Sequence, residues 1–416
     1  MTLKPHQTEA VAKAMPILKS KGLVYIFGQP RVGKSLIALE LSKQCVPKQP
    51  GKTLVFTKKM AIIDWLQYNE SYDYEVTNYE KAEKLNPDDY NFIIIDEAHN
   101  FGAFPKPSQR IKTMRQFCKG KPIVFLSGTP FVESPNSVYS QLSLSTFSPF
   151  NNLYNGYLFF KLYGIPDPIY LYGKQVESYK KANWPKIEAV ISPYIVKVTY
   201  DDAGIEYSNT DKIHKLYDAD LEELLEGICK TWTACENYSI EEWESYDGRS
   251  GTYFTAIGGY PLESVSASSQ AMLQYIGGFY KDLNLPQTKL DWLKKFVEDN
   301  PGKTAIMSYY RQEQEELTEM FKDNPNVDIF SSTKYCEGID LSGYDHYVLY
   351  SFGYSGAKFI QLRDRVVNIH RNRPTQVHIP IIMGTPDEDH YARVKNKENF
   401  NLSMAFAYYS KKGKNN

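Results

Sequence analysis

The chain has 416 residues, of which 42% are hydrophobic and 23% are charged, and its formal net charge is -1. This composition excludes an intrinsically disordered chain, and the near-zero net charge excludes a protein that binds nucleic acid through its overall basicity. No apolar stretch is long enough to span a membrane, and the five cysteines form no CxxC pair. We therefore expect a cytoplasmic protein without a zinc knuckle.

Strand and helix signals alternate through the first part of the chain. Runs of β-branched and aromatic residues predict strands at residues 22–27, 53–57, 91–95 and 122–126, and the apolar periodicity predicts helices at 6–18, 35–43 and 61–68. Strands separated by helices pair in parallel through right-handed crossovers, which favours an α/β doubly wound sheet. We assign residues 1–145 to this first lobe.

The alternation weakens in the middle of the chain and then returns. Residues 131–285 contain Pro and Gly clusters, many Tyr and an acidic helix near 218–228, so we expect a mostly helical accessory region over residues 146–285. The later segment predicts helices at 289–298, 312–322 and 358–369, and strands at 304–308, 327–330, 346–350 and 377–383. Residues 286–416 are therefore predicted to form a second α/β lobe.

The segment GQPRVGKS lies between the first predicted strand and the helix that follows it. It matches the phosphate-binding pattern G-x-x-x-x-G-K-[ST], in which the glycines let backbone N–H groups wrap the phosphates at a helix N-terminus. Lys34 is expected to reach the β- and γ-phosphates of ATP, and Ser35 is expected to hold Mg²⁺. The predicted loop residues are Gly28, Gln29, Pro30, Arg31, Val32, Gly33, Lys34 and Ser35.

A DEAH sequence follows the apolar strand predicted at residues 91–95. A carboxylate at the carboxyl end of a parallel strand points toward the ligand crevice of a doubly wound sheet. We expect Asp96 to hold Mg²⁺ and Glu97 to orient and deprotonate the attacking water. Phosphoryl transfer depends more on positioning and charge neutralisation than on covalent chemistry, so these few groups suffice for ATP hydrolysis.

These motifs, in this order, resemble those of superfamily 2 helicases, and the further signatures are similar to the chromatin-remodeller-like branch in the compact DEAH-box form found in bacteriophage proteins. The resemblance runs over residues 3–397 and implies two RecA-like lobes. In LKPHQ (residues 3–7) it implies that Gln7 reads adenine. The segments LVFTKKMAIIDW (54–65), VTNYE (76–80) and SGTP (127–130) resemble further family motifs, and the last implies that Ser127 and Thr129 link to the DEAH box.

In the second lobe, AIMSYYRQEQEEL (305–317) resembles the opening strand and helix of the family, and GTPDEDHYARVKNK (384–397) its closing segment. The resemblance of FSSTKYCEGIDL (330–341) implies that Thr333 touches a nucleic-acid phosphate and that Glu337, Gly338 and Asp340 face the nucleotide. The family usually has two adjacent glycines where this chain has Cys336, Glu337 and Gly338. Lys58, Lys59, Thr129 and Thr333 are the expected phosphate contacts, which give position without reading sequence.

The arginine motif departs most from the family. The usual pattern is Q-x-x-x-R-x-x-R, and this chain has Gln361 and Arg365 at the first two places but Asn368 at the third. Arg371 follows three residues later and can lie on the same helix face. The resemblance implies that Arg365 and Arg371 neutralise charge on the γ-phosphate. A basic helix that binds nucleic-acid phosphate or acidic neighbours is the alternative.

The sequence thus predicts an ATP- and Mg²⁺-dependent DNA helicase or translocase that remodels forked or branched replication and recombination intermediates. We expect a monomer whose partners are DNA and possible single-strand-binding or recombination proteins, in the host bacterial cytoplasm if the chain is phage-encoded. An RNA helicase and a non-translocating clamp or protein-displacement ATPase remain open alternatives. A metabolic kinase with the same phosphate loop needs neither a second α/β lobe nor an arginine helix.

Overall fold

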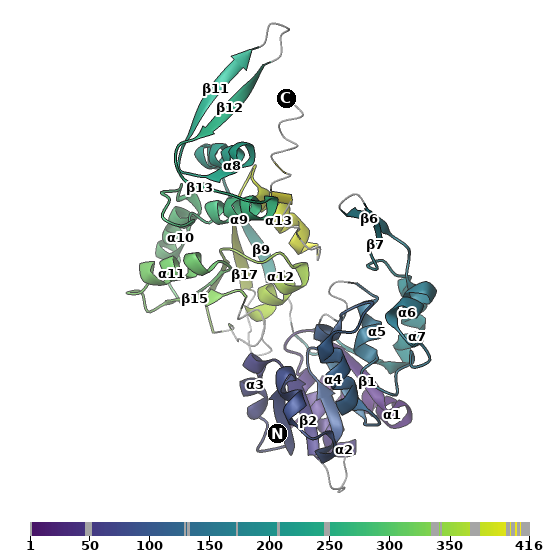
Figure 1. Cartoon of the computed structure of the whole chain (residues 1–416). Coiled ribbons are helices and arrows are strands. Elements are labelled where there is room, and N and C mark those ends of the chain that lie inside the picture. Colours follow the sequence, from purple (N-terminus) through teal and green to yellow (C-terminus); the bar gives the residue numbers. More distant parts are fainter. Residues whose placement is uncertain are drawn as a thin grey trace. The chain divides into compact units, whose positions relative to one another are not determined.

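The computed structural model describes residues 2–45, 52–128, 130, 134–171, 174–205, 209–244, 250–333, 341, 343–366, 375–396, 400, 404–405 and 408. The chain divides into two compact units, Met1–Glu206 and Tyr207–Asn416. Each unit contains its own parallel sheet and its own buried core (Figure 1).

The first unit begins with a helix whose two ends carry clear sequence signals. Pro5 occupies the first turn, and Gly22 ends the helix in the left-handed region with φ of 70°. The described elements of this unit are, in chain order, α1 (Pro5–Lys21), β1 (Leu23–Gly28), α2 (Lys34–Cys45), β2 (Lys52–Thr57), α3 (Ile62–Leu66), β3 (Tyr74–Asn78), β4 (Tyr90–Ile95), α4 (Gln109–Cys118), β5 (Ile123–Ser127), α5 (Ser137–Leu142), α6 (Gly156–Tyr163), β6 (Pro168–Leu171), β7 (Lys174–Glu177), α7 (Trp184–Ile191) and β8 (Ile195–Val198).

The sheet of the first unit has six strands in the order β3-β2-β4-β5-β1-β8. All of its pairings are parallel. The central strands are buried along most of their length because they consist of β-branched, leucine and aromatic residues, as expected for a parallel sheet covered on both faces. Since all six strands point the same way, the segments that follow β1, β4 and β5 share the carboxyl edge of the sheet.

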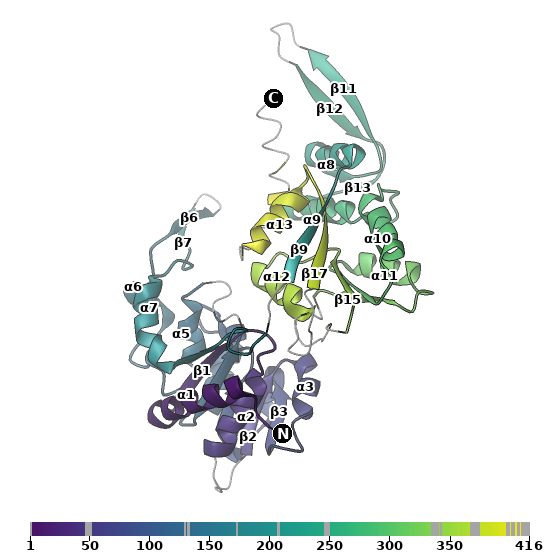
Figure 2. The ribbon, with the colours of Figure 1, turned by 180° about the vertical axis from the view of Figure 1, so that it is seen from behind.

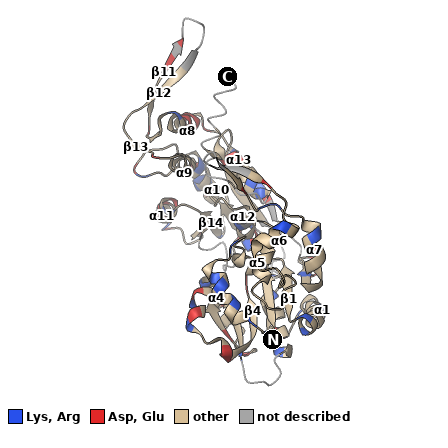
Figure 3. Ribbon diagram, turned by 45° about the vertical axis from the view of Figure 1, so that its right-hand side comes forward, with Lys and Arg blue, Asp and Glu red and all other residues tan. Residues whose placement is uncertain are grey.

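The second unit begins with a strand and ends with a helix. Its described elements are β9 (Asn209–Leu216), α8 (Ala219–Thr231), β10 (Thr233–Ala234), β11 (Tyr238–Glu244), β12 (Ser250–Ala256), β13 (Tyr260–Pro261), α9 (Val265–Ile276), α10 (Thr288–Asp299), β14 (Thr304–Ser308), α11 (Arg311–Met320), β15 (Val327–Ser331), β16 (His346–Leu349), α12 (Gly356–Arg363), β17 (Thr375–Ile382) and α13 (Pro386–Lys395). The antiparallel pair β11–β12 extends beyond α8 in both Figure 1 and Figure 2. Glutamates of β11 give it the acidic colour visible in Figure 3, whereas α4 of the first unit carries basic residues.

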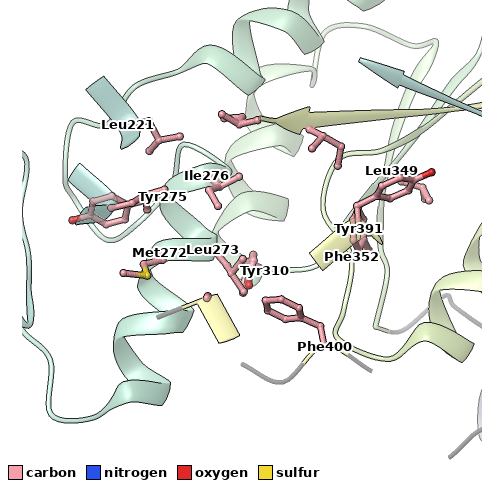
Figure 4. Packing of buried hydrophobic residues seen from close by; sticks show 14 of the residues in the cluster. Leu221, Met272, Leu273, Tyr275, Ile276, Tyr310, Leu349, Phe352, Tyr391 and Phe400 are labelled. Carbon is pink, nitrogen blue, oxygen red and sulfur yellow. The ribbon is translucent and has the colours of Figure 1, made fainter. Parts of the chain in front are cut away.

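The sheet of the second unit has five parallel strands in the order β15-β14-β16-β17-β9. Its larger core joins the helices α8 and α9 to the sheet through buried residues such as Leu221, Met272, Tyr275 and Leu349 (Figure 4). A smaller core on α10 and α11 includes Leu293 and Leu317. Burial of this apolar surface is the main term that stabilises the unit.

The predicted α/β fold with two RecA-like lobes is confirmed by these two parallel sheets. The strands predicted in both lobes are present to within about two residues. None of the helices in the described ranges combines the length and the apolar run that a bilayer crossing needs.

The region over residues 146–285, expected to be a mostly helical accessory region, is divided between the two units at residue 206. It contributes β8 to the edge of the first sheet and β9 to the edge of the second. Its remaining part adds α6 and α7 to the first unit and α8 and α9 to the second, together with the hairpins β6–β7 and β11–β12. β9 is mostly polar, with Ile213 and Leu216 as its apolar residues, as suits a strand at a sheet edge, and it lacks the apolar run that marks a central strand.

Candidate active site

The loop between β1 and α2 turns sharply at the carboxyl edge of the first sheet. β1 ends at Gly28 and α2 begins at Lys34, so the loop leads directly into a helix N-terminus. Arg31 and Gly33 have positive φ angles of 65° and 82°. The Lys34 ammonium donates to the carbonyl oxygens of Gly28 at 2.8 Å and of Gln29 at 3.0 Å. This geometry fits the concave phosphate-binding loop that the sequence predicts.

Residues of α1 hold the loop from one side. His6 Nε2 lies 3.0 Å from the carbonyl oxygen of Val32. Gln7 is buried, and its Oε1 accepts from the backbone N–H of Lys4 at 2.9 Å. The φ of 82° at Gly33 favours glycine, and a Cβ atom there would lie 2.0 Å from Nε2 of Gln7, so that side chain would have to move. The expected adenine-reading residue therefore packs directly against the phosphate loop.

The edge strand β8 holds the loop from another side. The backbone N–H of Gln29 donates to the carbonyl oxygen of Val198 at 3.0 Å. The side-chain oxygen of Gln29 in turn accepts from the backbone N–H of Tyr200. These contacts fix the middle of the loop, and they come from a segment that the sequence assigned to the accessory region.

Asp96 directly follows β4 and is held by donors from three other elements. Its Oδ2 accepts from Thr57 Oγ1 at 2.8 Å and from Trp65 Nε1 at 3.1 Å. The Tyr79 hydroxyl donates to its carbonyl oxygen. Burial and the neighbouring Glu97 charge raise the pKa of the Asp96 carboxyl from 3.8 to about 6, although the two side-chain hydrogen bonds and Lys34 oppose this rise.

The rest of the DEAH segment turns tightly after Asp96. Glu97 adopts a left-handed conformation with φ of 46°, which is uncommon for a residue with a side chain and is typical of functional sites. His99 Nδ1 lies 3.2 Å from Glu97 Oε2 and 3.0 Å from Ser127 Oγ. Ser127 ends β5, so the histidine joins the DEAH segment to the SGTP segment.

The phosphate loop and the acidic segment lie at the same edge of one sheet, since β4, β5 and β1 are neighbours. A Cβ atom at Gly128 would lie 3.4 Å from the Gly28 carbonyl oxygen and 3.8 Å from Lys34 Nζ. The Lys34 charge also acts on the Asp96 carboxyl. Carboxylate oxygens are hard donors of the kind that Mg²⁺ prefers. The buried Asp96 carboxylate, close to the loop after β1, therefore fits this ion.

A buried tyrosine and a buried glutamine lie inside the first unit, next to the carboxyl edge of its sheet. The Tyr25 hydroxyl donates to Gln141 Oε1 at 2.6 Å, and Gln141 Nε2 donates to the Pro130 carbonyl oxygen at 2.7 Å. Burial raises the pKa of Tyr25, which keeps its phenol neutral. The pair connects the interior of β1 to the SGTP segment.

The remaining predicted site residues lie in both units. Ser35 is the second residue of α2, and Lys58 and Lys59 follow β2, where Lys59 is exposed. In the second unit, Thr333 follows β15 and is exposed, Gln361 is buried in α12, and Arg365 is half-buried in the short turn after α12. The residues of the prediction that lie outside the described part of the chain are Thr129, Glu337, Gly338, Asp340 and Arg371.

Several residues that hold the site were given no role by the sequence. His6, Thr57 and Tyr79 lie inside segments that resemble family motifs, yet their contacts to Val32 and Asp96 form only in the folded unit. Trp65 entered the prediction only through a resemblance, yet its indole N–H binds Asp96. Thr57 is a polar residue at the end of an apolar strand, in the place where Ser127 ends β5, and this pattern is a signal that could have identified it.

Comparisons with known proteins provide no family. No protein-family model matches the sequence, and no curated protein matches it. Among solved structures, the chain is similar to the crystal structure of the Hef helicase domain of Pyrococcus furiosus, with 13% sequence identity over 94% of this chain and 99% of that chain, and a TM-score of 0.49. A likeness at this level carries no argument about activity, and the assignment of two RecA-like lobes follows from the two parallel sheets themselves.

Proposed function

We propose that this chain is a nucleic-acid-stimulated ATPase of the superfamily 2 type that translocates along DNA and remodels forked or branched intermediates. The observation that carries this proposal is the pairing of a complete phosphate loop with the Asp96–Glu97 carboxylates at one edge of a parallel sheet. A second parallel sheet in the same chain distinguishes the protein from a metabolic kinase, which needs only one.

The proposed chemistry divides among residues of the first unit. Lys34 exchanges the carbonyls of Gly28 and Gln29 for the β- and γ-phosphate oxygens of ATP. Ser35 and Asp96 would hold Mg²⁺, which supplies charge neutralisation between the phosphates. Glu97 takes the proton of the attacking water, and His99 at 3.2 Å orients its carboxylate.

Residues next to these motifs are proposed to couple ATP hydrolysis to nucleic-acid binding. Ser127 contacts His99, so a change at Glu97 on loss of the γ-phosphate is transmitted to the SGTP segment, which we propose to contact the nucleic-acid backbone through Thr129. Lys58, Lys59 and Thr333 are the other proposed phosphate contacts. In the second unit, Arg365 and Arg371 are proposed to neutralise transition-state charge, with Gln361 as their partner in the motif.

The first experiment measures phosphate release by the full chain with ATP and Mg²⁺, alone and with single-stranded, double-stranded and forked DNA and with RNA. We expect stimulation by DNA, and greater stimulation by RNA would favour the RNA-helicase alternative. Displacement of a third strand from a DNA triplex then separates a translocase from a static clamp. An ATPase that no nucleic acid stimulates would refute the proposed function.

Two variants and a control assign the roles. Glu97→Gln is expected to bind ATP and lose about 10²–10⁴-fold in turnover, because only the proton acceptor is removed. Lys34→Ala is expected to lose ATP affinity as well. Lys294→Ala is the matched control, since Lys294 is a half-exposed lysine of α10 that pairs with Asp291 at 3.7 Å. Unchanged hydrolysis in Glu97→Gln would contradict the assignment of the base.

A further inference from the structure

The second unit contains a pocket of about 240 Å³ at the carboxyl edge of its sheet. Tyr309 follows β14, Ser332 and Thr333 follow β15, and Tyr354 and Ser355 follow β16, and all five line the pocket. In the sheet, β14 lies between β15 and β16. The strand that follows β14 in the chain pairs on one side of it, and the next strand pairs on its other side, so the strand order reverses at β14. The crevice at such a reversal is the preferred ligand site of an open parallel sheet.

Aromatic side chains form one wall of this pocket and are held in place. The rings of Tyr309 and Tyr354 have centroids 5.4 Å apart at 68°, and the Tyr354 hydroxyl lies 2.9 Å from that of Tyr310. A Cβ atom at Gly353 would lie 2.6 Å from the Tyr309 ring, so the ring lies directly on the glycine backbone. Phe352 and Tyr310 anchor this wall to the core cluster of Figure 4.

One of the lining residues, Ser332, has a buried hydroxyl group. Ser332 is 6% exposed, and its Oγ has no hydrogen-bond partner within the described ranges of the chain. A buried polar group without a partner is unfavourable, so a ligand that supplies a donor or acceptor here regains that free energy. This hydroxyl distinguishes the pocket from a purely apolar gap in the core.

The charge around the pocket suits one phosphate rather than three. Lys358 is the single cation among the described lining residues and lies in the first turn of α12. Ser355 caps this helix by accepting from the Lys358 backbone N–H at 3.4 Å. Thr333, at the other side, is exposed, and its hydroxyl lies 2.8 Å from Ser331 Oγ. A triphosphate needs a glycine-rich loop as well, and the first unit has one.

We propose that this pocket holds one unstacked base of a single-stranded nucleic acid. The base stacks on Tyr309 and Tyr354, its polar edge binds Ser332, and the adjoining phosphate lies near Lys358. The volume is below the roughly 300–1,000 Å³ of pockets for drug-sized ligands, and it suits a base with part of its sugar. Aromatic stacking of this kind tolerates every base. This inference rests on the proposed function and adds a base contact to phosphate contacts.

The test compares two single-stranded DNA probes of equal length, an oligothymidine and its abasic counterpart, binding to the full chain by fluorescence anisotropy. The wild type is expected to bind the base-bearing strand more tightly. Tyr309→Leu is expected to weaken binding of the base-bearing strand by about 5- to 150-fold. Its affinity for the abasic strand should hardly change, because the phosphate contacts remain. Tyr309→Phe retains the ring and should behave as the wild type. Tyr253→Leu, at a tyrosine of β12 that is 61% exposed, is the control for loss of a surface aromatic.

A second variant separates base binding from folding. Ser332→Ala removes only the unpartnered hydroxyl, so stability should be unchanged or higher, while the preference for the base-bearing strand falls about fivefold. Equal affinity of the wild type for both strands would overturn the pocket assignment while DNA-stimulated ATPase activity stays intact. If Tyr309→Leu instead changes the affinity for ATP, the pocket takes a mononucleotide and the inference is wrong. Binding of neither strand would refute the proposed function itself.

Discussion

Replacing Asp96 by asparagine should stabilise the free protein while abolishing its proposed ATPase activity. The Asp96 carboxyl is buried beside Glu97, and its pKa rises from 3.8 in the unfolded chain to about 6 in the folded one. Ionising this carboxyl therefore costs about 3 kcal/mol more in the folded than in the unfolded chain, at about 1.36 kcal/mol for each pH unit. Asparagine has nearly the same shape, and its oxygen still accepts from Thr57 and Trp65, whereas its amide nitrogen replaces the Oδ1 that accepts from the Glu97 backbone N–H at 3.0 Å, a loss that reduces the gain.

The size of the effect depends on pH. Well below the unfolded pKa of 3.8 the carboxyl is protonated in both states, and the variant gains nothing. Between pH 4 and 6 the folded chain holds its proton while the unfolded chain loses it, so the stability of the wild type falls as pH rises through this window. The advantage of Asp96→Asn should thus grow from near zero at pH 4 to at most about 3 kcal/mol at pH 8.

Urea unfolding of both proteins at several pH values, without nucleotide and with a chelator, measures this difference. Fluorescence is a suitable probe because Trp65 contacts Asp96 directly. A stability difference that stays flat between pH 4 and 8, or a variant less stable than the wild type at pH 8, would refute the reasoning. Phosphate release by the variant should be lost at every pH, because neither metal binding nor base orientation survives loss of the charge.

Other outcomes follow from single contacts. Gly33→Ala should weaken ATP binding and cost roughly 1–3 kcal/mol in stability, because φ is 82° and the new Cβ meets Gln7; an unchanged Kd in calorimetry contradicts this. Lys289→Met should destabilise the second unit by about 3–5 kcal/mol, since it leaves the buried Asp387 carboxylate without its partner at 2.8 Å. If Lys289→Met has the same free energy of unfolding as the wild type in urea, this ion pair does not stabilise the unit. Arg365→Ala should lower kcat by about 10³–10⁵-fold with ATP affinity little changed, and a loss in affinity alone would exclude a transition-state role.

The sequence predicted the central strands because they are buried on both faces and read as continuous apolar runs, such as the isoleucines of β4. The edge strands β8 and β9 were not predicted. β8 has only four residues, and β9 is polar except at Ile213 and Leu216, so neither shows the long apolar run of a central strand. Pairing to a distant neighbour, β1 or β17, makes each of them a strand, and no local pattern encodes that choice.

The phosphate loop was predictable because its glycines serve local backbone geometry, and Gly33 does adopt a positive φ. The residues that support the loop were not, since their positions depend on tertiary contacts. His6 and Tyr200 are far apart in the sequence, yet each binds a neighbouring part of the same loop. The pocket beside Tyr309 was likewise hidden, because its residues come from three separate segments that only the sheet brings together.

The ammonium of Lys34 has two carbonyl acceptors in its own loop. Binding of an anion to Lys34 therefore replaces these two hydrogen bonds. Only the difference in free energy between the old and the new contacts contributes to binding. An anion with a single phosphoryl group offers little beyond what the carbonyls supply, whereas a chain of three also engages the backbone N–H groups of the loop. On the proposed function, this exchange of contacts is expected to make the loop favour a triphosphate over inorganic phosphate without a dedicated gate.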